Sequence, residues 1–237
     1  MPNPYFSFKQ FTVFHDKCAM KVGIDGVLLG AWTDIENTGR ILDIGAGTGL
    51  IALMLAQRCN SNIVAIDIDS GAILQAKENI RNSPWPDRIE VYESSLQEFA
   101  IESMQLFDLI VSNPPYFINS LKAPSESRST ARHTDSLTHE ELIDNAIKLL
   151  SPAGRICLIL PVKEGMQCVE FAESKGLYCT KQVTVLPKPN AAAKRLLLEF
   201  SFVLVRKAES ELIIESDIRH HYSPEFTELA KDYYLKL

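Results

Sequence analysis

The sequence predicts an α/β fold in which a mostly parallel sheet is covered by helices on both faces and ends in an antiparallel pair of strands. Apolar runs of strand length alternate with segments of helical spacing from residue 40 to about residue 175. The runs are continuously apolar, which is typical of parallel strands buried on both faces. Two β-rich segments, residues 178–186 and 195–205, follow with no helical pattern between them and indicate the terminal antiparallel pair.

The elements of the sheet and its helices follow in a regular order. Strands are predicted at residues 40–44, 63–67, 89–92, 107–112 and 154–160, and helices at residues 50–58, 70–81, 138–150 and 164–175. Asp69 or Ser70 is suited to cap the second of these helices, and Thr138 with Glu141 has capping-box spacing at the third. Two prolines between residues 82 and 87 break the chain before the third strand.

The domain organisation follows from length and composition. The chain has 237 residues, 46% of them hydrophobic, and we expect residues 1–237 to form a single domain. Residues 40–206 are its expected core and residues 207–237 a C-terminal tail. Residues 1–39 are an N-terminal extension with a helix at residues 26–32 and aromatic side chains that we expect to pack. The polar residues 117–136 are expected to form a lid or substrate loop.

The sequence also indicates the cellular compartment of the protein and whether it binds a metal ion. The chain does not open with a basic region followed by an apolar stretch, and no apolar run reaches membrane-spanning length. The five cysteines are an odd number without a CxxC pair, which favours reduced thiols in a cytoplasmic protein. His220 and His221 have no acidic or cysteine partner at metal-ligand spacing, so we expect no metal site.

A glycine loop lies between the first strand of the core and the helix after it. Gly45, Gly47 and Gly49 allow unusual backbone angles and let a ligand approach the chain closely. Asp43, two residues earlier, suits the ammonium group of a methionine moiety, and Asp67 at the end of the next strand suits ribose hydroxyls. These residues predict a site for S-adenosylmethionine (SAM), against the alternative that the glycines merely form a tight turn.

The adenine end of such a cofactor is expected beyond the third strand. Ser95 follows that strand and is the candidate for contact with the adenine edge, where many such folds place an aspartate. Asp69 is an alternative ligand of the ribose, but its position before a helix suits a cap.

The tetrapeptide Asn113-Pro114-Pro115-Tyr116 follows an apolar strand and predicts the reaction. A planar amino nitrogen is a poor nucleophile because its lone pair is delocalised, so acceptors placed outside the plane favour reaction by holding its two N–H groups. The Asn113 side-chain oxygen and the Pro114 carbonyl are the expected acceptors. Pro115 helps to fix the backbone, and Tyr116 offers a face for stacking. The motif predicts methyl transfer to adenine N6 or to a glutamine side chain, against the alternative of a proline turn.

The charge of the chain bears on its partner. A net charge of −6 argues mildly against a nucleic acid. However, residues 181–198 contain Lys188, Lys194 and Arg195 and no acid, and the predicted hairpin places this basic run on a projecting loop. The run is either a solvated face or a contact for RNA phosphates. Arg132, which precedes His133 at the end of the polar loop, is likewise either solvated or an RNA contact.

Blocks along nearly the whole chain resemble one family. They are residues 6–11, 20–32, 113–117, 132–133, 186–189, 194–200, 222–226 and 231–235. They resemble the bacterial tRNA (adenine-N6)-methyltransferases that modify adenosine 37, directly 3′ of the anticodon, in a valine tRNA. The resemblance implies a Rossmann-like class I SAM-dependent methyltransferase fold with a seven-stranded sheet. It also implies tRNA as partner, S-adenosylhomocysteine as product, and no metal.

The resemblance assigns roles to particular residues. It implies residues 113–116 as the catalytic motif, and residues 43–49 with Asp67 as the cofactor site. Residues 21–30 would cover part of that site and bring Lys21 and Asp25 to the cofactor. Asp25 has an alternative role as a helix cap. Ile24 departs from the family, in which a hydroxyl residue is expected at this position.

Three other functions share some of these features. A glutamine-N5 protein methyltransferase uses the same tetrapeptide but usually has a separate N-terminal helical domain. Only 39 residues precede the first core strand here, which counts against this alternative. A DNA adenine methyltransferase would need space for a DNA-reading domain, so DNA is not the expected partner. A non-catalytic SAM-dependent RNA-binding protein would bind the cofactor without forming product. We expect a monomeric cytoplasmic enzyme that does not bind membranes.

Overall fold

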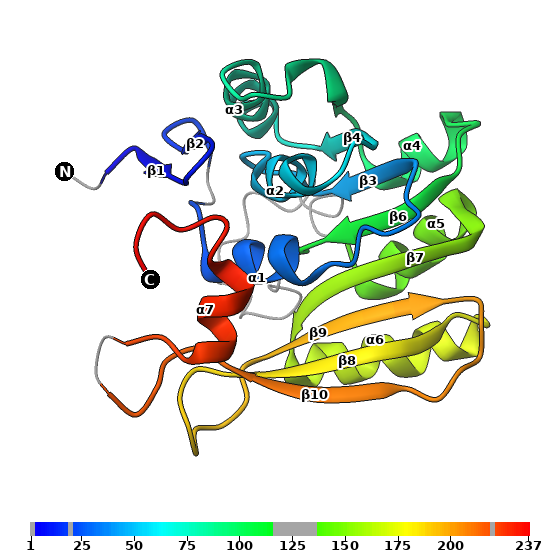
Figure 1. Ribbon diagram of the computed structural model, residues 1–237. Helices are drawn as coiled ribbons and strands as arrows, with labels where there is room; N and C mark the ends of the chain where they lie inside the picture. Colours follow the sequence, from blue (N-terminus) through cyan, green and yellow to red (C-terminus); the bar gives the residue numbers. More distant parts are fainter. Residues whose placement is uncertain (1–2, 19–20, 116–136, 219–220) are drawn as a thin grey trace, which may run out of the picture.

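The computed structural model describes residues 3–18, 21–115, 137–218 and 221–237 (Figure 1). Within these residues, eight strands form one sheet in the order β10-β8-β9-β7-β6-β3-β4-β5. The strands are β3 (Arg40–Ile44), β4 (Asn62–Asp67), β5 (Ile89–Glu93), β6 (Phe107–Ser112), β7 (Leu150–Pro161), β8 (Tyr178–Leu186), β9 (Arg195–Ser201) and β10 (Ala208–Ile213).

The direction of the strands agrees with the predicted sheet. Strands β3 to β7 pair in parallel, and β9 is antiparallel to both of its neighbours, β7 and β8. The mostly parallel sheet with a terminal antiparallel pair is therefore confirmed.

The predicted count of seven strands is wrong for the described residues, because β10 adds an eighth strand, parallel to β8. This strand lies in the segment that was expected to be a tail. Most of its side chains are exposed and polar, as is usual for an edge strand, so the sequence carries no apolar run there.

Helices cover both faces of the sheet. Helices α1 (Ile24–Trp32), α2 (Leu50–Arg58) and α3 (Ser70–Arg81) contribute to one hydrophobic core. Helices α4 (Leu96–Glu102), α5 (His139–Leu149) and α6 (Val162–Ser174) contribute to the other. Alternate residues of one strand serve the two cores: Ile41 packs in the first and Leu42 in the second. This two-sided burial explains why the core strands are apolar throughout.

The helix caps agree with the sequence where a cap was predicted. The Asp69 side chain accepts a hydrogen bond of 2.6 Å from the Ala72 amide and caps α3. Thr138 and Glu141 form both bonds of a capping box at α5. Helix α4 was not predicted, although Ser95 and Glu98 form a capping box at its start. With seven residues, it is too short to show a helical repeat.

The two ends of the described chain lie next to each other, at the left of the view in Figure 1. Strands β1 (Tyr5–Ser7) and β2 (Thr12–Phe14) form an antiparallel pair, and α7 (Pro224–Ala230) lies near the C-terminus. Phe8 bridges to Tyr234, and the Lys9 amide donates a hydrogen bond of 2.8 Å to the Tyr233 carbonyl. We call these four residues the terminal clasp. The aromatic side chains of the N-terminal extension therefore pack, as predicted.

Some predictions fall on residues that the structure does not describe. Tyr116, Arg132, His133 and the expected loop at residues 117–136 lie outside the described residues.

In the described part of the chain, none of the helices has both the length and the apolar character needed to cross a membrane.

Candidate active site

A cavity of about 920 Å³ lies at the carboxyl edge of the sheet. The ends of three parallel strands line it through Ile44 of β3, Asp67 of β4 and Ser112 of β6. Strand β3 lies between β4 and β6, so the chain order reverses at this point of the sheet. Open α/β sheets bind their ligands at such a switch point, outside the carboxyl ends of the strands.

The glycine loop forms one wall of the cavity with the backbone that the sequence predicted. Gly45, Gly47 and Gly49 have φ of 73°, 55° and 79°, in the left-handed region that favours glycine. A Cβ built on Gly45 or Gly47 would meet no heavy atom within 4 Å. The space in front of these two residues is therefore open to a ligand. Gly49 does not line the cavity and is instead the N-cap residue of α2.

Asp43 lies behind the loop and is not among the residues that line the cavity. It is fully buried, and its Oδ2 accepts a hydrogen bond of 3.2 Å from the Ala52 amide. Its Oδ1 has no hydrogen-bond partner within the described residues. Burial raises the pKa of Asp43 to about 7, and the nearby charge of Asp67 acts in the same direction. An unsatisfied buried carboxyl group at this position would be stabilised as the carboxylate by a cationic ligand.

Asp67 joins the glycine loop to the start of α3. Its Oδ2 accepts a hydrogen bond of 2.8 Å from the Gly47 amide, and its Oδ1 accepts one of 3.0 Å from the Asp69 amide. Both bonds fix the carboxylate at the wall of the cavity, where each oxygen retains capacity for a second donor. Asp69 also lines the cavity, but its side chain caps α3, which favours Asp67 as the ligand-binding carboxylate.

Ser95 lines the cavity, but its side chain is already engaged. The hydroxyl accepts a hydrogen bond of 3.1 Å from the Glu98 amide and donates one of 2.8 Å to Glu98 Oε2. Hydrogen bonds from the Ser95 hydroxyl and amide hold the pKa of Glu98 below its usual value. The predicted contact between the Ser95 hydroxyl and an adenine edge would therefore compete with the helix cap.

The first three residues of the tetrapeptide face the same cavity as the glycine loop. Asn113, Pro114 and Pro115 line it directly after β6. Ser112 is a further residue of the site that no sequence motif marks. It is buried, and its hydroxyl donates a hydrogen bond of 2.8 Å to the Ile44 carbonyl. This bond fixes the end of β6 against the end of β3. The signal for Ser112 was available, because it is a hydroxyl residue directly after the apolar residues 109–111.

Asp25 and Arg195 were predicted for different ligands, and the structure brings them together. The Arg195 guanidinium Nε donates a hydrogen bond of 2.8 Å to Asp25 Oδ2, and both residues line the cavity, as does Lys21. Asp25 lies in the first turn of α1, whose cap position is Gly23, so the alternative role of Asp25 as the cap is wrong. Arg195 is the first residue of β9 and lies at the cavity rather than on the hairpin loop.

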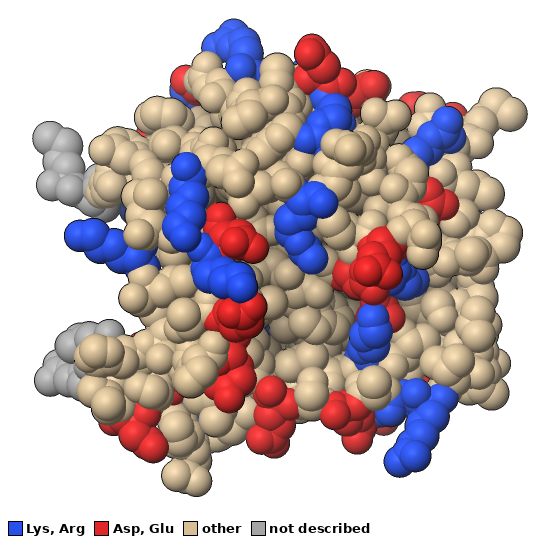
Figure 2. Space-filling view, viewed as in Figure 1, with Lys and Arg blue, Asp and Glu red and all other residues tan. Residues whose placement is uncertain are grey.

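The basic run is divided between two places. Lys188 lies on the loop between β8 and β9, where its ammonium group is 3.2 Å from Glu215 Oε2. Lys194 is exposed, and its backbone amide donates a hydrogen bond of 2.9 Å to the Val185 carbonyl across the base of the loop. Lys181 lies within β8, 3.2 Å from Glu199 and 3.6 Å from Asp34. On the face drawn in Figure 2, basic and acidic side chains are interspersed and form no continuous basic surface.

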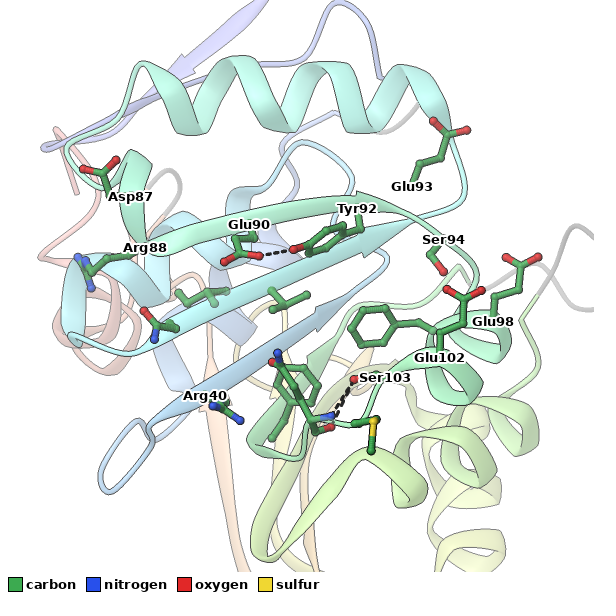
Figure 3. Close-up of a pocket in the computed structure, with 17 residues that line it drawn as sticks. Arg40, Asp87, Arg88, Glu90, Tyr92, Glu93, Ser94, Glu98, Glu102 and Ser103 are labelled. Carbon is green, nitrogen blue, oxygen red and sulfur yellow. Dashed lines mark hydrogen bonds between the residues drawn. The ribbon is translucent and has the colours of Figure 1, made fainter.

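A second hollow of about 790 Å³ lies against β4, β5 and α4 (Figure 3). It contains neither the glycine loop nor the tetrapeptide. Several of its carboxylates have partners within the fold: Glu90 accepts a hydrogen bond from the Tyr92 hydroxyl, and Glu98 belongs to the α4 cap. The motifs therefore place the chemistry in the first cavity. Among the described residues, no three His, Cys, Asp or Glu side chains are grouped as metal ligands.

Comparison with known sequences identifies close relatives. Residues 24–182 match the family model described as the methyltransferase small domain. The tRNA1(Val) (adenine(37)-N6)-methyltransferase of Parabacteroides distasonis is 54% identical over 237 residues, which cover 100% of both chains. The protein of the same name from Trichodesmium erythraeum is 46% identical and covers 98% of both chains.

Comparison with solved structures supports the fold. A predicted O-methyltransferase from Agrobacterium tumefaciens matches with a TM-score of 0.70 at 20% identity, covering 88% of this chain and 96% of that chain. A ribosomal protein L11 methylase from Lactobacillus delbrueckii subsp. bulgaricus matches with a TM-score of 0.56 at 17% identity, covering 78% and 82%. At these identities, the likeness concerns the fold alone.

Proposed function

The chain belongs to the tRNA1(Val) (adenine(37)-N6)-methyltransferase family, and we propose that it methylates N6 of adenosine 37 in a valine tRNA, with SAM as the methyl donor. One observation carries the assignment of this reaction to a site. Asn113 and Pro114 line the same cavity as Gly45, Gly47 and Asp67, so the acceptors proposed for the amino group lie in one cavity with the loop proposed to bind SAM. The enzyme is a SAM-dependent tRNA (adenine-N6)-methyltransferase.

The residues of the cavity fit SAM on two structural grounds. The open space in front of Gly45 and Gly47 allows a ligand to contact the backbone, and the unsatisfied carboxyl oxygen of Asp43 lies behind that backbone. We propose that the Asp67 carboxylate accepts hydrogen bonds from the ribose hydroxyls and that the Asp43 carboxylate favours the positive charge of the methionine moiety. When bound, SAM supplies an electrophilic methyl group and becomes S-adenosylhomocysteine.

The other wall of the cavity would contact the cofactor from the side of α1. Lys21 and Asp25 line this wall, and Ser95 lies at the end expected for the adenine. Since the Ser95 hydroxyl is held by Glu98, we propose that the Ser95 contribution comes chiefly from its position beside the ring. The reaction as proposed needs no metal ion.

Asn113 is the proposed catalytic residue. Its side-chain oxygen and the Pro114 carbonyl would accept hydrogen bonds from the two N6 hydrogens and so keep the nitrogen lone pair directed at the methyl group. Pro114 and Pro115 restrict the backbone around these acceptors, so little reorientation is needed during reaction. Tyr116, which follows directly in the sequence, is proposed to stack on the extruded adenine.

The tRNA is proposed to bind along the carboxyl edge of the sheet. The β8–β9 loop leaves this edge next to Arg195, so Lys188 and Lys194 are carried by the same element that reaches the cavity. We propose that these two lysines and Arg132 neutralise RNA phosphates and that Arg195 acts closer to the target nucleotide. The enzyme is proposed to act as a monomer in the cytoplasm, where tRNA is modified.

Methyl transfer to defined tRNA would test this function. Unmodified valine tRNA is incubated with the protein and SAM labelled in its methyl group, and a copy with guanosine at position 37 serves as the matched control. We expect label in the first RNA and none in the second. Equal labelling of both RNAs would show that adenosine 37 is not the methylated nucleotide. The absence of label from both, with SAM binding verified, would favour glutamine methylation or a non-catalytic role.

A further inference from the structure

The segment before α1 runs over α3 on its way to the cavity. We call residues 12–18 the strap. The strap begins with β2, and its last residue, Cys18, lines the cavity, as do Lys21 and Val22 farther along the chain. The position of the strap therefore affects the shape of one wall of the proposed cofactor site.

One buried side chain joins the strap to the glycine loop. Asn79 of α3 is only 1% exposed. Its Oδ1 accepts a hydrogen bond of 2.9 Å from the Phe14 amide, and its Nδ2 donates bonds of 2.9 Å to the carbonyls of Phe14 and Thr48. Phe14 belongs to the strap, whereas Thr48 lies between Gly47 and Gly49. Both N–H groups of the amide are thus used to connect two walls of the cavity.

Two more residues of α3 hold the strap at helical spacing. Gln75 is fully buried, and its Oε1 accepts a hydrogen bond of 3.0 Å from the Lys17 amide. At Gly71, a built Cβ would lie 2.7 Å from the Lys17 carbonyl oxygen, so only glycine permits this close approach. Residues 71, 75 and 79 lie four positions apart and therefore share one face of α3. The strap is docked along this whole face.

We propose that Asn79 is a positioning residue for the cofactor: by binding the strap and the glycine loop together, it sets the width of the cavity for SAM. This inference rests on the proposed function of the cavity as the SAM site. Asn79 is not among the residues that line the cavity, so it acts through Phe14 and Thr48. An amide that serves only the stability of the fold would lower the melting temperature without selectively weakening SAM binding.

The test compares three leucine variants of α3 in the full chain. Asn79→Leu removes the bonds to both walls. Gln75→Leu removes the bond to the strap and a bond of 3.4 Å to Glu78 Oε2, but no bond to the glycine loop. Asn82→Leu is the matched control, because Asn82 is an exposed residue after the last turn of the same helix. The dissociation constant of SAM is measured by calorimetry, well below the melting temperature of each variant. The KM for SAM and the KM for tRNA are measured alongside.

We expect Asn79→Leu to raise the dissociation constant and KM for SAM by roughly tenfold or more, the size expected for losing bonds to a buried group. Gln75→Leu is expected to raise both by a smaller factor, and Asn82→Leu to leave them unchanged. The KM for tRNA is expected to stay within about twofold in all three, because the bonds removed do not involve the proposed RNA-binding residues.

A folded Asn79→Leu protein that binds SAM as tightly as the wild type would overturn the inference. Should that variant fail to fold, Asn79→Ser gives the same decision, since serine is small and admits a water molecule at the site. The wild-type protein separates this outcome from a failure of the proposed function. If the wild type does not bind SAM, the function fails; if it binds and the variants bind equally, only the role of Asn79 fails.

Discussion

The guanidinium of Arg195 is hydrogen-bonded through Nε to Oδ2 of Asp25 at 2.8 Å, which joins the first turn of α1 to the first residue of β9 at the wall of the cavity. The two residues are 170 positions apart. The bond connects the wall proposed for the cofactor with the element proposed to bind tRNA. Both side chains are partly exposed, so the ion pair itself is expected to add little to the stability of the fold.

Breaking the ion pair between Asp25 and Arg195 is expected to weaken the binding of tRNA more than the binding of SAM. Arg195→Lys keeps the positive charge but loses the planar guanidinium group with its several donors. Asp25→Asn removes the carboxylate that orients this guanidinium group. Each change should raise the KM for tRNA by about three- to tenfold, which corresponds to about 1 kcal/mol. Steady-state kinetics on both single variants and the double variant would check this. If the free-energy losses of the two single variants add up in the double variant, the two residues act independently.

Loss of the Asn113 amide is expected to stop the reaction while leaving the cofactor bound. Asn113→Ala removes one of the two acceptors proposed for the N6 hydrogens, and the loss of one such group typically lowers kcat by about 100- to 1000-fold. The dissociation constant of SAM should change by less than about threefold, since the glycine loop and Asp67 are untouched. Single-turnover methylation and calorimetry measure the two quantities. Full activity in Asn113→Ala would remove the proposed mechanism.

The two exposed lysines of the β8–β9 loop are expected to govern the salt dependence of tRNA binding. The double change Lys188→Ala and Lys194→Ala should reduce the slope of log affinity against log salt by about 1.4–1.8, because each neutralised phosphate contributes about 0.7–0.9. Lys181→Ala is the control, because Lys181 lies within β8 rather than on the loop and is held by Glu199 and Asp34. Adding Arg195→Ala should weaken binding further. An unchanged slope in the double variant would show that this loop is not the RNA contact.

Asp43 is expected to make SAM binding depend on pH near neutrality. Burial raises the pKa of Asp43 to about 7, so the free enzyme holds a proton there at lower pH. Since a cationic ligand favours the carboxylate, binding must release this proton, and the dissociation constant should rise by up to about tenfold per pH unit below pH 7. Asp43→Asn should bind SAM more weakly at pH 8 and without this dependence. Calorimetry from pH 5.5 to pH 8.5 would show whether the dependence belongs to Asp43.

The same group is expected to affect the stability of the SAM-free fold in the opposite sense. The folded pKa lies above the ordinary value of 3.8, so the folded protein binds more protons than the unfolded chain between about pH 4 and pH 7. The contribution of Asp43 to stability is therefore present at low pH and lost as the pH rises through about 7. At pH 8, Asp43→Asn should raise Tm by roughly 2–8 °C, or about 1–2 kcal/mol. Thermal melts at pH 5 and pH 8 provide the measurement.

The parts of the fold that the sequence predicted are those with a local signal. Strand β3 and helix α2 have the predicted bounds because their apolar runs are long enough to define them, and Asp69 marked the start of α3. Helix α4 and strand β10 were missed, because a seven-residue helix shows no full repeat and an exposed edge strand is mostly polar. The cause in both cases is the lack of a buried stripe of sufficient length.

The residues of the candidate site also divide into those that a local motif predicts and those that depend on contacts between distant segments. The glycine loop and Asn113 were found from local motifs, and the structure places both at one cavity. The contact between Asp25 and Arg195 depends on how distant segments meet, and no local pattern reports it. Asn79 has the sequence signature of a surface residue, since it is polar in an amphipathic helix. It is buried only because the strap crosses that face of α3.

The terminal clasp has a consequence for the order in which the protein is completed during synthesis. Lys9 contacts Lys231 across 222 positions of the chain, and Phe8 pairs with Tyr234. A nascent chain that ends before α7 has none of these partners for Phe8 and Lys9, although every strand of the eight-stranded sheet has been made. Phe8 and Lys9 therefore leave the ribosome before the strands of the large sheet but reach these partners only after that sheet has been made. Because the strap continues directly from them, the cofactor wall should mature only after the C-terminal segment has emerged.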